Sequence, residues 1–125
     1  MRIIAILQTR MGSTRLPGKV MKQLCDKTVL AHVISRVRAC NLLDEVVVAT
    51  TNSSIDDVIV TEAEKYGAKW FRGSEDDVLD RYYLAAKNYH ADVVVRITSD
   101  CPLFDHTILS QMLEEFKKKQ VNNYK

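Results

Sequence analysis

Three cations and two glycines stand close together near the N-terminus, directly after a short apolar run. Arg10, Arg15 and Lys19 supply positive charge, and Gly12 and Gly18 allow the backbone to approach a ligand closely. Successive backbone N–H groups in such a loop can surround phosphate oxygens. The loop therefore predicts an anion site, with a nucleotide phosphate as the first ligand to consider. The alternative is a solvated basic loop.

The spacing of this basic loop differs from that of the Walker A phosphate loop. Walker A has four residues between its glycines and Ser or Thr after its lysine. Here five residues separate Gly12 from Gly18, and Val20 follows Lys19. The loop thus lacks the hydroxyl that would bind magnesium, and any metal ion must be bound from elsewhere in the chain.

Asp100 offers a carboxylate soon after a second apolar segment, at 92–97. Magnesium prefers oxygen ligands and usually takes one or two carboxylates together with phosphate oxygens and water. Asp100 is therefore predicted to be a magnesium ligand. The alternative is an Asp that only stabilises the turn before Pro102.

The distribution of apolar and capping residues predicts the strands and helices that would position these groups. Short apolar, β-branched runs predict strands at 3–7, 45–50, 69–71 and 92–97. Capping residues and helical spacing predict one helix after Thr28, one after Ser53 or Ser54, one opened by Glu75, and one capped by Asp105 or Thr107. The last helix is expected to stop near 117–120.

Two helical stripes are expected to face the core. Their residues are Val78, Tyr82, Ala85 and Tyr89 in one helix, and Ile108, Met112 and Phe116 in the other.

Strand and helix alternate four times, which predicts an α/β fold: a three-layer α/β/α sandwich with a mainly parallel sheet. Ligands of open α/β sheets bind outside the carboxyl ends of the strands. The loops at 9–19, 50–54, 72–77 and 98–102 should therefore converge on one crevice.

Composition narrows the class of protein. The 125 residues have the size of one domain, and a net charge of +2 is too balanced for a nucleic-acid binder that works by charge. No apolar run approaches the roughly 20 residues of a membrane span, and no secretory signal is evident. Three cysteines without CxxC spacing indicate neither a disulfide framework nor a zinc site. We therefore expect a cytoplasmic protein without nucleic-acid or membrane partners.

Three segments, in this order along the chain, resemble the sugar-activating cytidylyltransferases. They are residues 8–19, 72–82 and 96–103. The resemblance is to the CMP-KDO and CMP-sialic acid synthetases and, more closely, to the spore coat polysaccharide biosynthesis protein F family. It implies a Rossmann-like nucleotide-diphospho-sugar transferase fold, of which residues 1–125 would form the nucleotide-binding N-terminal part of a single domain.

The resemblance also implies an activity. A sugar or sugar-acid hydroxyl would attack the α-phosphate of CTP, giving a CMP-sugar and pyrophosphate for cell-surface or spore coat polysaccharide. Arg10, Arg15 and Lys19 would hold the triphosphate, and Mg²⁺ would be bound by Asp100 and by a second carboxylate beyond Lys125. The residues expected to bind the nucleotide are Leu7, Gln8, Thr9, Gly12, Ser13, Thr51, Ser74, Asp80 and Arg96.

Several alternatives remain open at this stage. For Asp80 and Arg81 a helix-surface ion pair or packing at the edge of the core is as plausible as a site role, and Arg96 needs either a partner or a ligand. The chain could be a nucleotide-binding module without catalysis, a nucleotidyltransferase that uses another NTP, or a structural domain with an incidental basic loop. Because one edge of the predicted sheet lacks a neighbour, we also expect a homo-oligomer, most simply a dimer.

Overall fold

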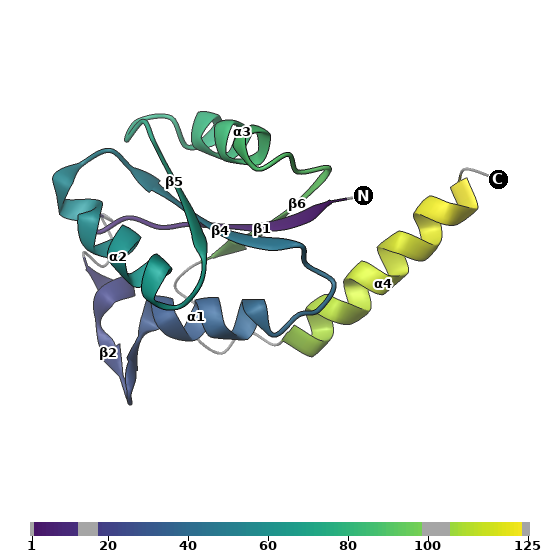
Figure 1. Cartoon of the computed structure of the whole chain (residues 1–125), viewed down its shortest axis with the longest axis horizontal. Coiled ribbons are helices and arrows are strands. Elements are labelled where there is room, and N and C mark those ends of the chain that lie inside the picture. The colour runs from purple at the N-terminus through teal and green to yellow at the C-terminus, as the bar shows by residue number, and fades with distance from the viewer. Residues whose placement is uncertain (1, 13–17, 99–105, 124–125) are drawn as a thin grey trace.

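A computed structural model describes residues 2–12, 18–98 and 106–123 of the chain (Figure 1). The strands are β1 (Ile3–Gln8), β2 (Gln23–Leu24), β3 (Lys27–Thr28), β4 (Glu45–Thr51), β5 (Lys69–Gly73) and β6 (Val93–Thr98). The α-helices are α1 (Val29–Arg38), α2 (Asp57–Lys65), α3 (Val78–Asn88) and α4 (His106–Asn123), and the 3₁₀ helices are η1 (Lys19–Met21) and η2 (Ser54–Asp56).

The four longer strands form one parallel sheet in the order β5-β4-β1-β6. At the end of β1, Gln8 lies opposite Ala49 of β4 and Thr98 of β6, and Thr51 of β4 lies opposite Gly73 of β5. All four strands therefore end at the same edge. This confirms the predicted parallel α/β sheet, with strand ends shifted by one or two residues.

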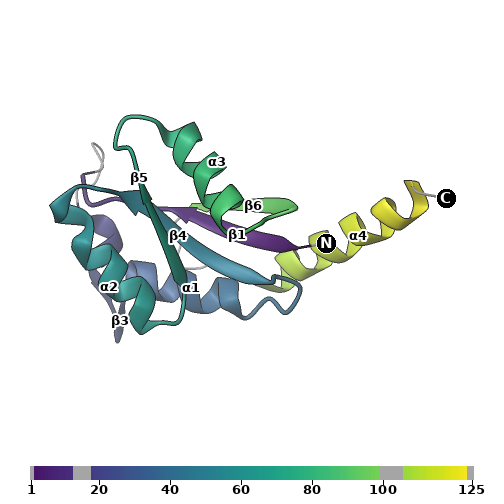
Figure 2. The same cartoon turned by 45° about the horizontal axis from the view of Figure 1, so that its top comes forward.

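Helices cover both faces of this sheet. Figures 1 and 2 show α1 and α2 on one face and α3 on the other. In β1, Ile3, Ala5 and Leu7 pack on the α1–α2 side, whereas Ile4 and Ile6 pack on the α3 side, and all five are fully buried. Because both faces are covered, β1 is apolar throughout instead of alternating, as is typical of a central parallel strand.

The last helix differs from its prediction. Its first half contacts the body, where Leu113 is buried and Ser110 Oγ lies 3.2 Å from Cys40 Sγ on the α1 side. The rest of α4 extends away from the sheet (Figure 1), so the helix does not stop at 117–120. Met112 is 63% exposed and Phe116 36%, so the predicted stripe was wrong at these two positions.

The other predicted stripe is largely confirmed. Ala85 is buried and both Tyr82 and Tyr89 are half-buried against the sheet, but Val78 is 44% exposed because it stands in the first turn, at the rim of the covered face. Among the described residues, no helix is long and apolar enough to cross a membrane.

Capping side chains set where the helices begin. Thr28 caps α1 as predicted, accepting from the Ala31 N–H at 3.0 Å. Asp77 caps α3 by accepting from the Asp80 N–H, so this helix starts at Val78 and not at Glu75. The 3₁₀ helix η2 precedes α2, so the N-cap of α2 is Asp56 and not one of the predicted serines. The short β2–β3 hairpin was not predicted, because two-residue strands leave no periodic pattern.

Thr28 also joins two helices. Its hydroxyl donates at 2.6 Å to Oε2 of Glu62, a carboxylate of α2 that is only 8% exposed. This bond satisfies a buried charged group, which would otherwise be costly.

We predict that Thr28→Ala lowers the free energy of unfolding by about 2–3 kcal/mol, because it removes a helix cap and leaves Glu62 without its donor. Urea denaturation measures the change. Thr61→Ala is the matched control: Thr61 is exposed and its hydroxyl only bonds the Asp57 carbonyl of its own helix, so a change of about 0.5 kcal/mol or less is expected. Equal losses in the two variants would contradict the prediction.

Candidate functional site

The order of the strands places a crevice beside the end of β1. From β1 the chain passes through α1 to β4 and through α2 to β5, and then returns through α3 to β6 on the other side of β1. The helices before this return lie on one face of the sheet and α3 lies on the other (Figure 2). In open α/β sheets such a reversal of strand order marks the ligand site. The basic loop leaves β1 at this point.

Hydrogen bonds fix both ends of the basic loop. The Thr9 N–H donates to the carbonyl of Ala49 at 2.9 Å, continuing the pairing of β1 with β4. The Met11 N–H donates to Asp56 Oδ1 at 2.7 Å, and the Met11 carbonyl accepts from the Gly18 N–H at 2.9 Å. Gly18 has a φ of 72°, which glycine adopts without strain. Met11 therefore joins the start of the loop to its end.

Two of the three predicted phosphate-binding cations lie within the described residues. Arg10 is exposed and Lys19 is half-buried at the start of η1. Within 2–12, 18–98 and 106–123, neither side chain forms an ion pair with a carboxylate, so both charges can serve a ligand. Arg15 and Ser13 lie outside the described residues, and Gly12 is exposed beside them.

Asp56 is a buried carboxylate at the same edge, with an exposure of 2%. Besides the Met11 N–H, it accepts a hydrogen bond from the hydroxyl of Thr51, which in turn accepts from the Ser53 N–H at 3.2 Å. The sequence analysis did not predict that Asp56 would bind the basic loop. An acidic residue before a helix is ordinary, and nothing along the chain indicates a contact with Met11, which is 45 positions away.

Arg81 is a buried cation on the α3 side, with an exposure of 3%. Its Nε donates to Gln8 Oε1 at 3.0 Å and its Nη1 to the carbonyls of Ser74 at 3.0 Å and Glu75 at 3.4 Å. Burial, followed by the nearby Arg10 guanidinium, lowers the pKa of Arg81, while Asp56 acts in the opposite direction. Its charge therefore adds to a positive potential at the carboxyl edge.

The surface ion pair considered for Asp80 and Arg81 is not formed among the described residues. Asp80 is half-buried in the first turn of α3. Gln8 connects β1 to this helix, since its Nε2 donates to the Val78 carbonyl at 3.0 Å. Gln8, Asp80 and Arg81 thus lie together where β1 ends and α3 begins.

Two further predicted residues occupy the neighbouring strand ends. Ser74 is exposed directly after β5 and accepts from the Asp76 N–H at 3.2 Å. Thr51 ends β4, and Arg72 fixes its backbone, because the Arg72 Nε donates to the Thr51 carbonyl at 2.8 Å. Arg72 also pairs with Asp57 at 2.7 Å, which stabilises the β4–α2 loop.

The remaining predicted residues have clear surroundings. The side chain of Leu7 is fully buried, so any contact with a ligand would use its backbone, and Thr9 is 4% exposed. Arg96 is exposed on the edge strand β6, with its guanidinium carbon 4.5 Å from the centre of the Tyr82 ring. The partner that a charge in an apolar strand requires is therefore an aromatic face.

The part of the chain that the structure describes holds no group of three His, Cys, Asp or Glu side chains suited to a metal ion. Asp56 belongs to no such group; it is 2% exposed, and its two oxygens accept from the Met11 N–H and the Thr51 hydroxyl. Asp100 lies outside the described residues, so its magnesium role stays a prediction.

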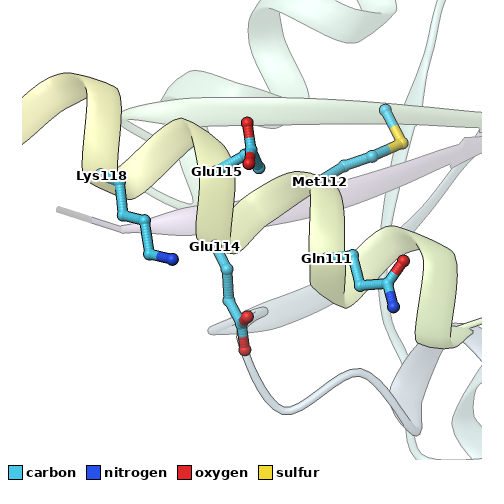
Figure 3. Close-up of a pocket in the computed structure, with 5 residues that line it drawn as sticks. All are labelled: Gln111, Met112, Glu114, Glu115 and Lys118. Atoms are coloured by element: carbon cyan, nitrogen blue, oxygen red, sulfur yellow. The ribbon is translucent and has the colours of Figure 1, made fainter.

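A shallow hollow on α4 is a poor alternative site. Gln111, Met112, Glu114, Glu115 and Lys118 line it, all of them exposed and all from a single helix (Figure 3). Figure 3 shows their side chains spread along the helix without a common point. The residues at the carboxyl edge, by contrast, come from four segments and are joined by hydrogen bonds.

Known proteins are similar to this chain in sequence and in fold. A family model described as cytidylyltransferase matches residues 4–125. The spore coat polysaccharide biosynthesis protein SpsF of Bacillus subtilis is 38% identical over 116 residues, which cover 90% of this chain and 48% of that protein. The 3-deoxy-manno-octulosonate cytidylyltransferase of Trichlorobacter lovleyi is 34% identical over 118 residues, which cover 93% of this chain and 45% of that protein.

A solved cytidylyltransferase structure from Leptospira borgpetersenii superposes with a TM-score of 0.92 at 43% identity, covering 96% of this chain and 50% of that one. The chain thus spans about half the length of the relatives it matches. Because the family model extends over nearly all of its residues and the strand order and basic loop agree with that assignment, this chain belongs to the cytidylyltransferase family.

Proposed function

We propose that this chain binds CTP and forms the nucleotide-binding part of a cytidylyltransferase that transfers CMP to a sugar or sugar acid. The observation that carries the proposal is the basic loop tied down at the reversal point of the sheet, with the charges of Arg10 and Lys19 free of protein partners among the described residues. The names of the relatives support CTP as the nucleotide and a sugar acid as an acceptor. The name of SpsF supports polysaccharide biosynthesis as the purpose.

In this reaction the chain mainly positions the reactants and neutralises the charge of the phosphates. The acceptor hydroxyl loses its proton to water as its oxygen bonds to the α-phosphorus, and the bond from that phosphorus to the bridging oxygen breaks to release pyrophosphate. Arg10, Arg15 and Lys19 hold the triphosphate and stabilise the charge that builds on the leaving group. The residues that bind the nucleotide are Leu7, Gln8, Thr9, Gly12, Ser13, Thr51, Ser74, Asp80 and Arg96. Among them, Thr51, Ser74 and Asp80 flank the base and the sugar.

Mg²⁺, when bound by Asp100 and the triphosphate, adds charge neutralisation at the same place. We place the activity in the cytoplasm, a reducing compartment that suits the free thiols of Cys25 and Cys40.

Calorimetric titration with CTP, ATP, GTP and UTP in the presence of Mg²⁺ tests the nucleotide, and pyrophosphate release with a sugar-acid acceptor tests the transfer. We expect CTP to bind in preference to the other three. Binding without pyrophosphate release would favour a nucleotide-binding module without catalysis, which is compatible with a chain that spans half of its relatives. Preference for another triphosphate would make it a different nucleotidyltransferase.

Our second prediction concerns the cations of the basic loop. Lys19→Ala and Arg15→Ala should each weaken CTP binding about tenfold or more, because each removes a charge-assisted contact with the triphosphate. Lys118→Ala is the matched control, because it makes the same change of charge at an exposed position on α4. This variant should bind CTP as the wild type does. Unchanged CTP affinity together with a lower melting temperature would show that the loop is structural.

A third prediction concerns the metal. Asp100→Asn should abolish the magnesium dependence of CTP binding while the melting temperature stays close to that of the wild type, since the amide is a poor ligand for a hard cation. Asp26→Asn, in an exposed turn, serves as the control and should keep the dependence. If magnesium stimulates binding equally in both variants, Asp100 is not a ligand.

We also propose that two copies associate. The support is apolar surface on α3, where Leu79 is 74% and Tyr83 63% exposed, next to β6, which pairs with β1 on one side only among the described strands.

The fourth prediction follows from this surface: sedimentation over a concentration series should show a dimer, and Leu79→Ser with Tyr83→Ser should shift it toward the monomer. Val58→Ser, which removes an exposed apolar side chain from α2, should leave the equilibrium unchanged. A wild-type chain that stays monomeric throughout would overturn the proposal.

A further inference from the structure

Asp56 is a buried carboxylate for which the proposed reaction provides no role. It is 2% exposed and lies at the edge where a triphosphate is expected to bind. Burying a carboxylate is costly, and a negative charge beside a phosphate site opposes the binding of the ligand. A group with two such costs must contribute something that an apolar residue could not.

The contacts of Asp56 show what this contribution is. One oxygen accepts the Met11 N–H at 2.7 Å, and the other accepts the Thr51 hydroxyl. Hydrogen bonds to an ionised acceptor are about twice as strong as those between neutral groups. Asp56 therefore connects the end of β4 to a backbone position in the basic loop.

Met11 is the position through which the basic loop can be held. Arg10 precedes it directly, and its carbonyl accepts from Gly18, the residue before Lys19. Fixing the peptide on both sides of Met11 thus restricts where the Arg10 and Lys19 side chains leave the backbone. Two cations on a loop bind a triphosphate well only when their positions are set before binding, because ordering them afterwards costs entropy.

We propose that Asp56 is a positioning residue: by binding Met11 it holds both ends of the basic loop, and with them Arg10 and Lys19, in the arrangement that binds a triphosphate. The ligand in this inference rests on the proposed function, whereas the ordering of the loop does not. This scheme gives Asp56 no metal role: the side chain is 2% exposed, and each of its oxygens accepts a hydrogen bond from the protein.

Substitutions at Asp56 separate positioning from charge. Asp56→Asn keeps an oxygen that can accept the Met11 N–H and presents an amide N–H to the Thr51 hydroxyl, which can accept as well as donate. It also removes the unfavourable charge, so CTP affinity should stay within about threefold of the wild type or become tighter. Asp56→Ala removes the acceptor, and CTP affinity should fall about tenfold or more.

Glu62 provides a matched control for the loss of a buried carboxylate. It is 8% exposed and accepts a hydroxyl hydrogen bond from Thr28 within the α1–α2 layer, and no side-chain hydrogen bond joins it to the described residues of the basic loop. Glu62→Ala should lower the melting temperature as Asp56→Ala does, but it should leave CTP affinity unchanged at a temperature where both variants are folded. If Asp56→Ala does not fold, Asp56→Ser replaces it, since a serine hydroxyl can bond locally but is too short to reach Met11.

Amide hydrogen exchange without nucleotide gives a readout that does not depend on the ligand. In Asp56→Ala the Met11 and Gly18 amides should exchange faster than in the wild type, whereas in Asp56→Asn and Glu62→Ala they should stay protected. If the wild type binds no triphosphate, the proposed function fails, and these exchange rates alone decide whether Asp56 orders the loop.

Four results would overturn the inference. The first three are wild-type CTP affinity in Asp56→Ala, unchanged exchange at Met11 in that variant, and an equal loss of CTP affinity in Glu62→Ala. Loss of the magnesium dependence in Asp56→Asn would also overturn it, because it would identify Asp56 as a metal ligand.

Discussion

The burial of β1 between two parallel neighbours is the constraint on which the rest of the structure depends. β4 and β6 pair along its two edges, and helices pack on both of its faces. Its five apolar residues are fully buried, so the strand has one register and one place to end. The polar residues that follow these five, Gln8 at the end of β1 and Thr9, therefore lie at a defined point beside β4 and β6.

Hydrogen bonds connect the polar groups that surround the end of β1. Gln8 joins β1 to Arg81 and to the first turn of α3, and Asp56 joins the end of β4 to Met11. Neither Asp56 nor Arg81, the two buried charges at this edge, forms an ion pair among the described residues. Backbone groups and neutral side chains satisfy each of them, which keeps the exposed cation Arg10 available to a ligand.

The two faces of the sheet are covered to different extents. α1 and α2 share one face of the sheet, whereas α3 alone packs on the other (Figure 2). On the α3 side of β6, Val94 is 38% exposed and Arg96 contacts the Tyr82 ring. The basic loop is thus supported by a well-covered part of the sheet, and the apolar surface proposed for self-association lies on the sparsely covered part.

The sequence by itself determined the strands, the cap at Thr28, the position of the basic loop after β1, and the family. These features depend on local patterns, such as an apolar run, a capping residue or a motif, which are legible along the chain. The convergence of strand ends also followed, because parallel strands joined by helices must end on one side.

Only the tertiary structure decided the contact of Asp56 with Met11, the burial of Arg81, the partner of Arg96, and the exposure of Met112 and Phe116. Each of these depends on which distant segment packs against a given residue. An Asp before a helix and an Arg within one look the same along the chain whether they lie in water or against another loop. Three-dimensional packing alone distinguishes these cases, because the cost of burying a charge arises only when a neighbour removes its water.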